Sequence, residues 1–137
     1  PKEFEKLLDK LDQLRAAGIT IICLCHTTTK TRRNPHGPDY DCSLPTLSDV
    51  VWQSASKRFD VLLFGTFEMQ VTKSSPRDRK GKAVGSDHRI VLARPGASHE
   101  AGGRYNLPDI IDGGESPAEC WANFHEVLIN STCEELP

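Results

Sequence analysis

A nearly continuous apolar run from Ile19 to Cys25, broken only by Thr20, constrains the fold most strongly. A run without alternation is typical of a strand that is covered on both faces, as in a parallel sheet. It follows a stretch whose apolar residues recur at helical spacing and which stops at Gly18. Helix, glycine and buried strand make half of a β-α-β unit, so the sequence predicts an α/β fold with a mainly parallel sheet and flanking helices. The apolar helical positions are Phe4, Leu7, Leu8, Leu11 and Leu14.

The middle of the chain contributes two further predicted strands. Residues 27–45 contain prolines and a glycine but no apolar periodicity, so we expect a long mobile loop there. We expect a short helix over 47–57 and buried strands over 60–67 and 88–94. The two strands are predicted to pair as a C-terminal β-hairpin across a basic tip at 72–82.

The last predicted helix has the clearest start signal. Ser116, Pro117 and Glu119 have the spacing of an N-cap, a first-turn proline and a capping box. The apolar residues of its predicted inner face are Trp121, Phe124 and Leu128.

Length, charge and cysteine content exclude several classes of protein. The 137 residues suffice for one domain, and no window approaches the about 18 apolar residues of a membrane span. The formal net charge of -2 excludes a surface coated in positive charge, so any nucleic-acid contact must come from local patches. The five cysteines are odd in number, which favours reduced thiols in the cytoplasm. The chain starts with Pro1 and leads straight into a helix, which suggests a piece of a longer chain.

His26 is the first candidate functional residue. It stands where the predicted buried strand meets the polar loop, and ligands of parallel α/β sheets bind at the carboxyl ends of strands. An imidazole at that place can donate a hydrogen bond to a phosphate oxygen or orient a water molecule. The alternative is a strand-end histidine that is bonded to a local carbonyl.

Two basic clusters are candidates for nucleic-acid binding. Cations close together on a loop suit phosphate contacts, which are independent of base sequence. The alternative for each cluster is an ordinary solvated loop or hairpin tip. The candidate residues are Lys30, Arg32 and Arg33 in the first cluster and Arg77, Arg79 and Lys80 in the second.

A metal site has suitable residue types but poor spacing. There is no C-x₂-C pair, so we predict no metal ligand and keep a small zinc-binding protein only as a second alternative. No Gly-x-x-x-x-Gly-Lys-Ser/Thr phosphate loop occurs in the sequence, so the chain has no visible means of cradling a triphosphate alone. The residues weighed as metal ligands are Cys23, Cys25, His26, His36 and Cys42.

The order of several segments resembles the C-terminal half of phage-type RecA-like ATPases, a family associated with single-strand annealing and recombination. The resemblance covers nearly all of residues 1–137 and implies a partial P-loop NTPase core. The segments are IICLCH, NPHGPDYD, RFDVLLF, RYNLP and ESPAECWANFHEVL.

The resemblance implies roles for individual residues. It makes His26 the sensor of the ATP γ-phosphate and places the loop after it near DNA. Arg104 and Tyr105 match basic and aromatic positions that reach a neighbouring subunit's nucleotide, which implies a catalytic Arg104 and a nucleotide-binding Tyr105. Gly102 stands where the family has a lysine. The phosphate loop and the Mg²⁺-binding acidic strand would lie upstream of Pro1.

The resulting prediction is part of an ATP-dependent recombination or annealing ATPase that binds single-stranded DNA. It would form a homo-oligomer with ATP and Mg²⁺ at subunit interfaces, without contact to a membrane, in the cytoplasm (of the host if it is phage-encoded). This chain alone would be inactive as an ATPase. The first alternative is a non-catalytic nucleic-acid-binding or assembly module.

Overall fold

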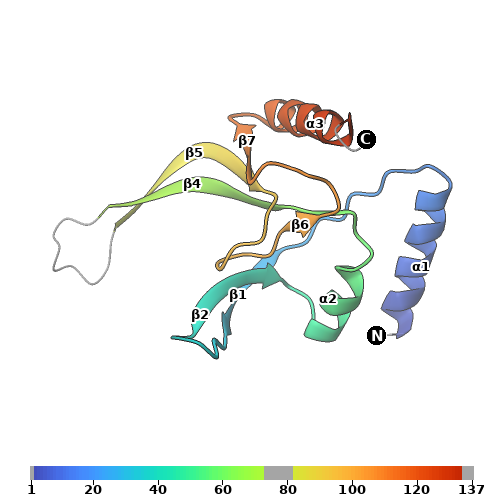
Figure 1. The fold of residues 1–137 in the computed structure, drawn as a ribbon, viewed down its shortest axis with the longest axis horizontal. Helices are drawn as coiled ribbons and strands as arrows, with labels where there is room; N and C mark the ends of the chain where they lie inside the picture. Colours follow the sequence, from blue (N-terminus) through green and yellow to red (C-terminus); the bar gives the residue numbers. More distant parts are fainter. Residues whose placement is uncertain (1, 73–81, 134–137) are drawn as a thin grey trace. The chain divides into compact units, whose positions relative to one another are not determined.

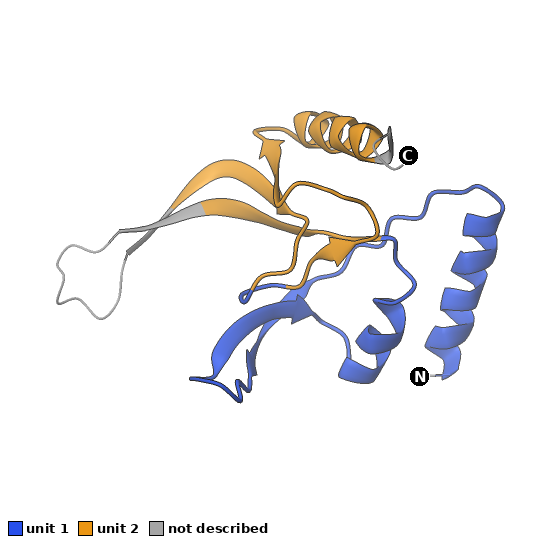
Figure 2. Ribbon diagram, in the orientation of Figure 1, with its two compact units in different colours: residues 1–60, 97–99 blue, residues 61–96, 100–137 orange. Residues whose placement is uncertain are grey.

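The computed structural model describes residues 2–72 and 82–133, and the chain divides into two compact units. Unit 1 comprises Pro1–Asp60 and Ala97–His99, and unit 2 comprises Val61–Gly96 and Glu100–Pro137 (Figure 2). No helix in the described ranges is long and apolar enough to cross a lipid bilayer.

Three helices and seven strands are distributed over these units (Figure 1). Unit 1 contains α1 (Lys2–Ala16), β1 (Thr27–Arg32), β2 (Tyr40–Pro45) and α2 (Asp49–Ala55). Unit 2 contains β3 (Val61–Leu62), β4 (Phe64–Thr72), β5 (Lys82–Leu92), β6 (Gly102–Gly103), β7 (Ile110–Gly114) and α3 (Pro117–Cys133).

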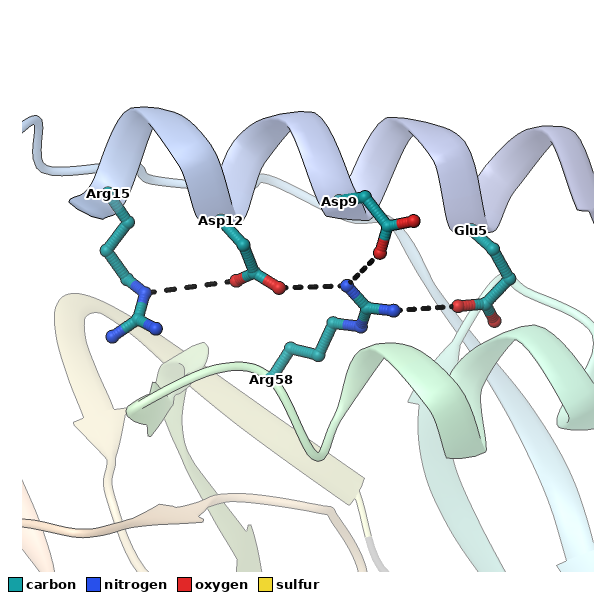
Figure 3. A network of polar contacts seen from close by, with 5 residues as sticks. All are labelled: Glu5, Asp9, Asp12, Arg15 and Arg58. Carbon is teal, nitrogen blue, oxygen red and sulfur yellow. Dashed lines mark hydrogen bonds and ion pairs between the residues drawn. The ribbon is translucent and has the colours of Figure 1, made fainter. Parts of the chain in front are cut away.

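The predicted first helix is confirmed as α1, and its end has the predicted glycine. Gly18 has a φ of +86°, and the Ile19 N–H donates to the Leu14 carbonyl at 3.2 Å, as in a Schellman cap. The acidic face of α1 holds Arg58, which follows α2 (Figure 3). The Arg58 guanidinium donates to three carboxylates of α1: Asp9 at 2.7 Å, Asp12 at 2.8 Å and Glu5 at 3.0 Å.

The predicted buried strand over Ile19–Cys25 is wrong. None of its residues belongs to a strand, and side chains within it are exposed, Ile22 to 66% and Leu24 to 94%. The prediction rested on apolar content alone, but a strand also needs a neighbour to complete its backbone hydrogen bonds. Among the described residues, no strand pairs with this run.

The predicted loop over 27–45 is a β-hairpin instead. Strands β1 and β2 pair antiparallel from Thr27 opposite Pro45 to Arg32 opposite Tyr40. The first strand is rich in threonine, whose β-branched side chain favours extended structure, and proline, glycine and asparagine make the turn. On the other edge of β2, the Ser43 N–H donates to the Ser98 carbonyl at 2.8 Å, beside an isolated parallel bridge to His99.

The later predicted strands exist, but they form antiparallel sheets. The predicted hairpin is confirmed as the pairing of β4 with β5, and β7 pairs with the other edge of β5. The run predicted as one strand over 60–67 is divided, because β3 pairs with β6 in a separate two-stranded sheet.

These sheets correct the predicted fold class. Every sheet in the described part of the chain has two or three strands, all antiparallel, so the chain does not form a RecA-like core with a parallel sheet. Parallel neighbours need a crossover of about a dozen or more residues, usually through a helix. Here the strands of the two hairpins follow each other directly in the chain, which permits only the antiparallel arrangement.

The core of unit 2 lies between β7 and α3. Ile111, Ala93 and Leu107 are buried, and half-buried side chains pack against them, including Phe124 and Leu128 of α3. Trp121, which was predicted on the inner face of this helix, is exposed.

The predicted capping signals of α3 are confirmed. The Ser116 hydroxyl accepts a hydrogen bond from the Glu119 N–H at 3.2 Å. The Glu119 carboxylate accepts one from the Glu115 N–H at 2.9 Å, one residue earlier than in the standard capping box.

Candidate nucleic-acid interface

The hairpin β1–β2 brings the first basic cluster together. Lys30 and Arg32 are two residues apart in β1, so they lie on the same face of the hairpin, and Arg33 follows directly. Lys30 is opposite Cys42, which is 3% exposed, and Arg32 is opposite Tyr40, which is 38% exposed. This face is therefore buried towards the base of the hairpin and open towards its turn, where the arginines lie.

A defined turn supports this open end of the face. The Asn34 N–H donates to the Asp39 carboxylate at 3.0 Å, and the Asn34 side chain bonds the Pro38 carbonyl and the His36 N–H. Pro38 has a fixed φ angle, so the turn loses less conformational entropy when a ligand binds. Arg33 is exposed at the start of this turn.

Lys30 is held by a carboxylate of α2. Its ammonium group lies 2.7 Å from the Asp49 carboxylate. The hydrogen bond and charge of Lys30 lower the pKa of Asp49, and the charge of Arg32 lowers it further. A lowered carboxyl pKa means that the pair stabilises the fold above the ordinary pKa and is lost as the pH falls through the folded value. The pair is therefore intact at neutral pH, and Asp49 competes with any phosphate for Lys30.

We expect Asp49→Asn to strengthen nucleic-acid binding and to steepen its salt dependence by up to about 0.7 in log-log slope, the contribution of one phosphate contact on a single strand. The substitution keeps the size of the side chain and removes the charge that competes for Lys30. Fluorescence anisotropy of a labelled oligonucleotide over a salt series measures the slope.

The matched control for this change is Asp41→Asn. Asp41 lies in the same hairpin, but its carboxylate accepts a hydrogen bond from the Thr31 hydroxyl at 2.7 Å and has no cation partner in the described part of the chain. Both variants change the net charge equally, so a steeper slope in Asp49→Asn alone reports release of Lys30. Equal slopes in the two variants would contradict competition at Lys30.

His26 lies at the base of the hairpin, away from the turn. It precedes β1 and is exposed, and its backbone carbonyl accepts a hydrogen bond from the Thr46 N–H at 2.8 Å. The expected strand end is thus the start of a different strand, because the preceding apolar run is unpaired. The role of His26 as a γ-phosphate sensor stays a prediction.

The predicted nucleotide residues of the C-terminal half belong to unit 2. Arg104 is exposed, whereas Tyr105 packs against the buried cluster of Ala93, Leu107 and Ile111. Packing against that cluster gives the Tyr105 ring a structural role. Arg77, Arg79 and Lys80, the predicted second basic cluster, lie outside the described residues.

Gly102 has a conformational reason to be glycine. Gly102 has a φ of +145° in β6, a region that residues with a Cβ rarely adopt. A lysine at this position would therefore strain the short β3–β6 pairing.

Sequence reasoning missed Tyr40 and Asp49 as members of this site. The alternation of β-branched and basic residues in TTTKTR, followed by the turn residues NPHGPD, was an available hairpin signal. Reading it would have placed Tyr40 opposite Arg32. The Lys30–Asp49 pair depends on how α2 packs and had no local signal.

Comparison with known proteins does not identify a family for this chain. The described residues contain no group of three or more His, Cys, Asp or Glu side chains that could hold a metal ion. The chain matches no protein-family model, and no curated protein and no solved structure is similar to it at a significant level.

Proposed function

We propose that this chain binds nucleic acid through the phosphate backbone, using Lys30, Arg32 and Arg33 of the hairpin β1–β2. The observation that carries the proposal is the register, which places Lys30 and Arg32 on one face of the hairpin, with Arg32 at its open end and Arg33 next to it in the chain. Spaced cations on a rigid strand suit a polyanion better than a single small anion.

The two carboxylates of the hairpin, Asp39 and Asp41, have hydrogen-bond partners of their own. Asp41 is opposite Thr31, so it lies on the other face, where its carboxylate accepts a hydrogen bond from the Thr31 hydroxyl. Asp39 accepts a backbone hydrogen bond within the turn. Asp49 is bonded to the cluster at Lys30. The basic face of the hairpin is thus the face that carries Lys30 and Arg32, of which Lys30 is paired with Asp49.

This proposal corresponds to the non-catalytic alternative that the sequence left open. Binding of ATP and Mg²⁺, assembly into a homo-oligomer and a cytoplasmic location stay predictions from the resemblance and the cysteine content. They extend the proposal but do not support it, because the basic face is defined by the hairpin alone.

The proposal is tested by titrating the chain into a fluorescein-labelled oligo(dT) and following anisotropy from low to physiological salt. We expect the logarithm of the binding constant to fall linearly with the logarithm of salt concentration, with a slope between about -1.4 for the two arginines alone and about -2.1 for three full phosphate contacts. Absence of binding at low salt, or a slope near zero, would contradict the proposal.

Lys6→Ala is the matched control in this titration. Lys6 is a cation of α1 in the same unit, and it pairs with Glu3 at 2.8 Å. Its removal changes the net charge by the same amount as the loss of one hairpin cation. An unchanged slope in this variant assigns the salt dependence to local contacts and not to the charge of the whole chain.

A further inference from the structure

Tyr40 is an exposed aromatic residue beside the basic cluster. The ladder places it directly opposite Arg32, and opposite residues of an antiparallel pair have their Cβ atoms about 4.5–5.5 Å apart. The side chains of both residues lie on the face that also carries Lys30. In the part of the chain that the structure describes, the Tyr40 ring has no hydrogen bond and no aromatic or cation partner.

Other exposed rings of the chain differ from Tyr40 in this respect. Phe67 is covered by the guanidinium of Arg89, 5.5 Å from the ring centroid. Trp121 packs against Phe124 and His125 with ring centroids 6.1 and 5.9 Å away. Tyr40 thus combines an open ring face with an adjacent cation, the combination that single-strand-binding surfaces use.

The hairpin holds this ring in place before any ligand binds. Tyr40 begins β2, directly after the turn closed by Asn34 and Asp39, and the next residue on its face, Cys42, is buried. Its backbone position is therefore fixed by the ladder, and a tyrosine has few side-chain torsions to lose.

We propose that Tyr40 stacks against an unpaired base while the neighbouring arginines hold the adjoining phosphate, so that the hairpin selects single-stranded over double-stranded nucleic acid. This inference rests on the proposed function. In a duplex the base faces are already stacked on one another, whereas every unpaired base offers a face regardless of its sequence. The arginines bind both forms through phosphate, and Tyr40 provides the difference between them.

The test compares oligo(dT) with an abasic deoxyribose-phosphate strand of equal length and charge. The wild-type chain should bind oligo(dT) about 5- to 150-fold more tightly, the range measured for the loss of one base–aromatic stack. Tyr40→Ala should remove this difference by weakening oligo(dT) binding alone. Its salt slope should remain that of the wild type, because no charge is lost.

Two further variants separate stacking from packing. Tyr40→Phe keeps the ring and should retain the preference, whereas Tyr40→Leu keeps apolar volume without a ring and should lose it. Circular dichroism of each variant checks the hairpin. Equal preference in the wild type and in Tyr40→Ala or Tyr40→Leu would overturn the inference.

Failure of the proposed function gives a different result from failure of this inference. If the phosphate contacts are absent, the wild type binds neither strand and shows no salt slope. If only the stacking is absent, the wild type binds both strands equally with the expected slope. A duplex of the same sequence should resemble the abasic strand, in that its affinity does not change in Tyr40→Ala.

Discussion

Truncating Ile111 to alanine should lower the free energy of unfolding by about 2–5 kcal/mol, as expected for a large-to-small change in a packed core. Ile111 is 2% exposed and lies in β7 opposite Val91 of β5. Its side chain contributes to the cluster that joins β7 to α3, with Ala93 and Leu107. Removing it leaves a cavity that the short strand cannot close without moving its neighbours.

The preceding residue is the matched control. Ile110 is 58% exposed, and it lies on the opposite face of the same strand. Ile110→Ala removes the same atoms from the same element, yet it should cost about 1 kcal/mol or less, because most of that side chain already contacts water.

Urea unfolding measures the difference between the two variants. Trp121 in α3 reports on unit 2, and a Trp52→Phe background removes the emission of the other tryptophan. A slip of one residue in the β5–β7 register would exchange the faces of the two isoleucines. Equal losses, or a larger loss for Ile110→Ala, would therefore contradict the antiparallel register described above.

The parts of the fold that were predicted correctly are those fixed by local interactions. The end of α1 depends on Gly18, and the start of α3 depends on Ser116 and Glu119, all within a few residues of the bonds they make. The pairing of β4 with β5 likewise joins strands that are neighbours in the chain. The capping signals can be read from one sequence because both partners of each bond lie within a few residues, and the hairpin can be predicted because its strands are consecutive in the chain.

The wrong predictions came from weighting hydrophobicity above strand pairing. The run Ile19–Cys25 was interpreted as a strand because it is apolar, but apolar content does not supply a neighbouring strand. The TTTKTR segment was interpreted as a loop because it is polar, although its β-branched residues favour a strand. The prediction therefore placed a strand before His26, whereas β1 begins after it.

The candidate site was predicted only in part, because its arrangement also depends on strand pairing. The three cations were found from composition, since they are close in sequence. Their arrangement depends on the register with β2, which brings Tyr40 to Arg32, and on α2, which brings Asp49 to Lys30. The residue types of the site could thus be predicted from sequence. Which aromatic ring and which carboxylate lie beside the cations could not.

Replacing Lys30, Arg32 and Arg33 together by alanine should weaken binding to a single strand and flatten its salt dependence by about 1.4 to 2.1 in log-log slope, depending on how far Asp49 withholds Lys30. Each lost phosphate contact removes about 0.7 of slope on a single strand, irrespective of the bases. Between 50 and 200 mM salt, the wild type should accordingly lose about 7- to 18-fold more affinity than the triple variant. The same titration on oligonucleotides of different sequence should give the same change. A triple variant with the wild-type slope would show that these residues are only a solvated face.

The three cations should not contribute equally, because Lys30 must leave Asp49 before it can contact a phosphate. We expect Lys30→Ala alone to flatten the slope by less than about 0.7, and by close to that value in an Asp49→Asn background. Arg32→Ala/Arg33→Ala should flatten it by about 1.4 in either background if both arginines contact phosphates. The four combinations of the Lys30 and Asp49 substitutions form a double-mutant cycle, which isolates the coupling between the two residues from their separate effects. A cycle without coupling would mean that Asp49 does not restrain Lys30 in solution, even though the two groups lie 2.7 Å apart in the structure.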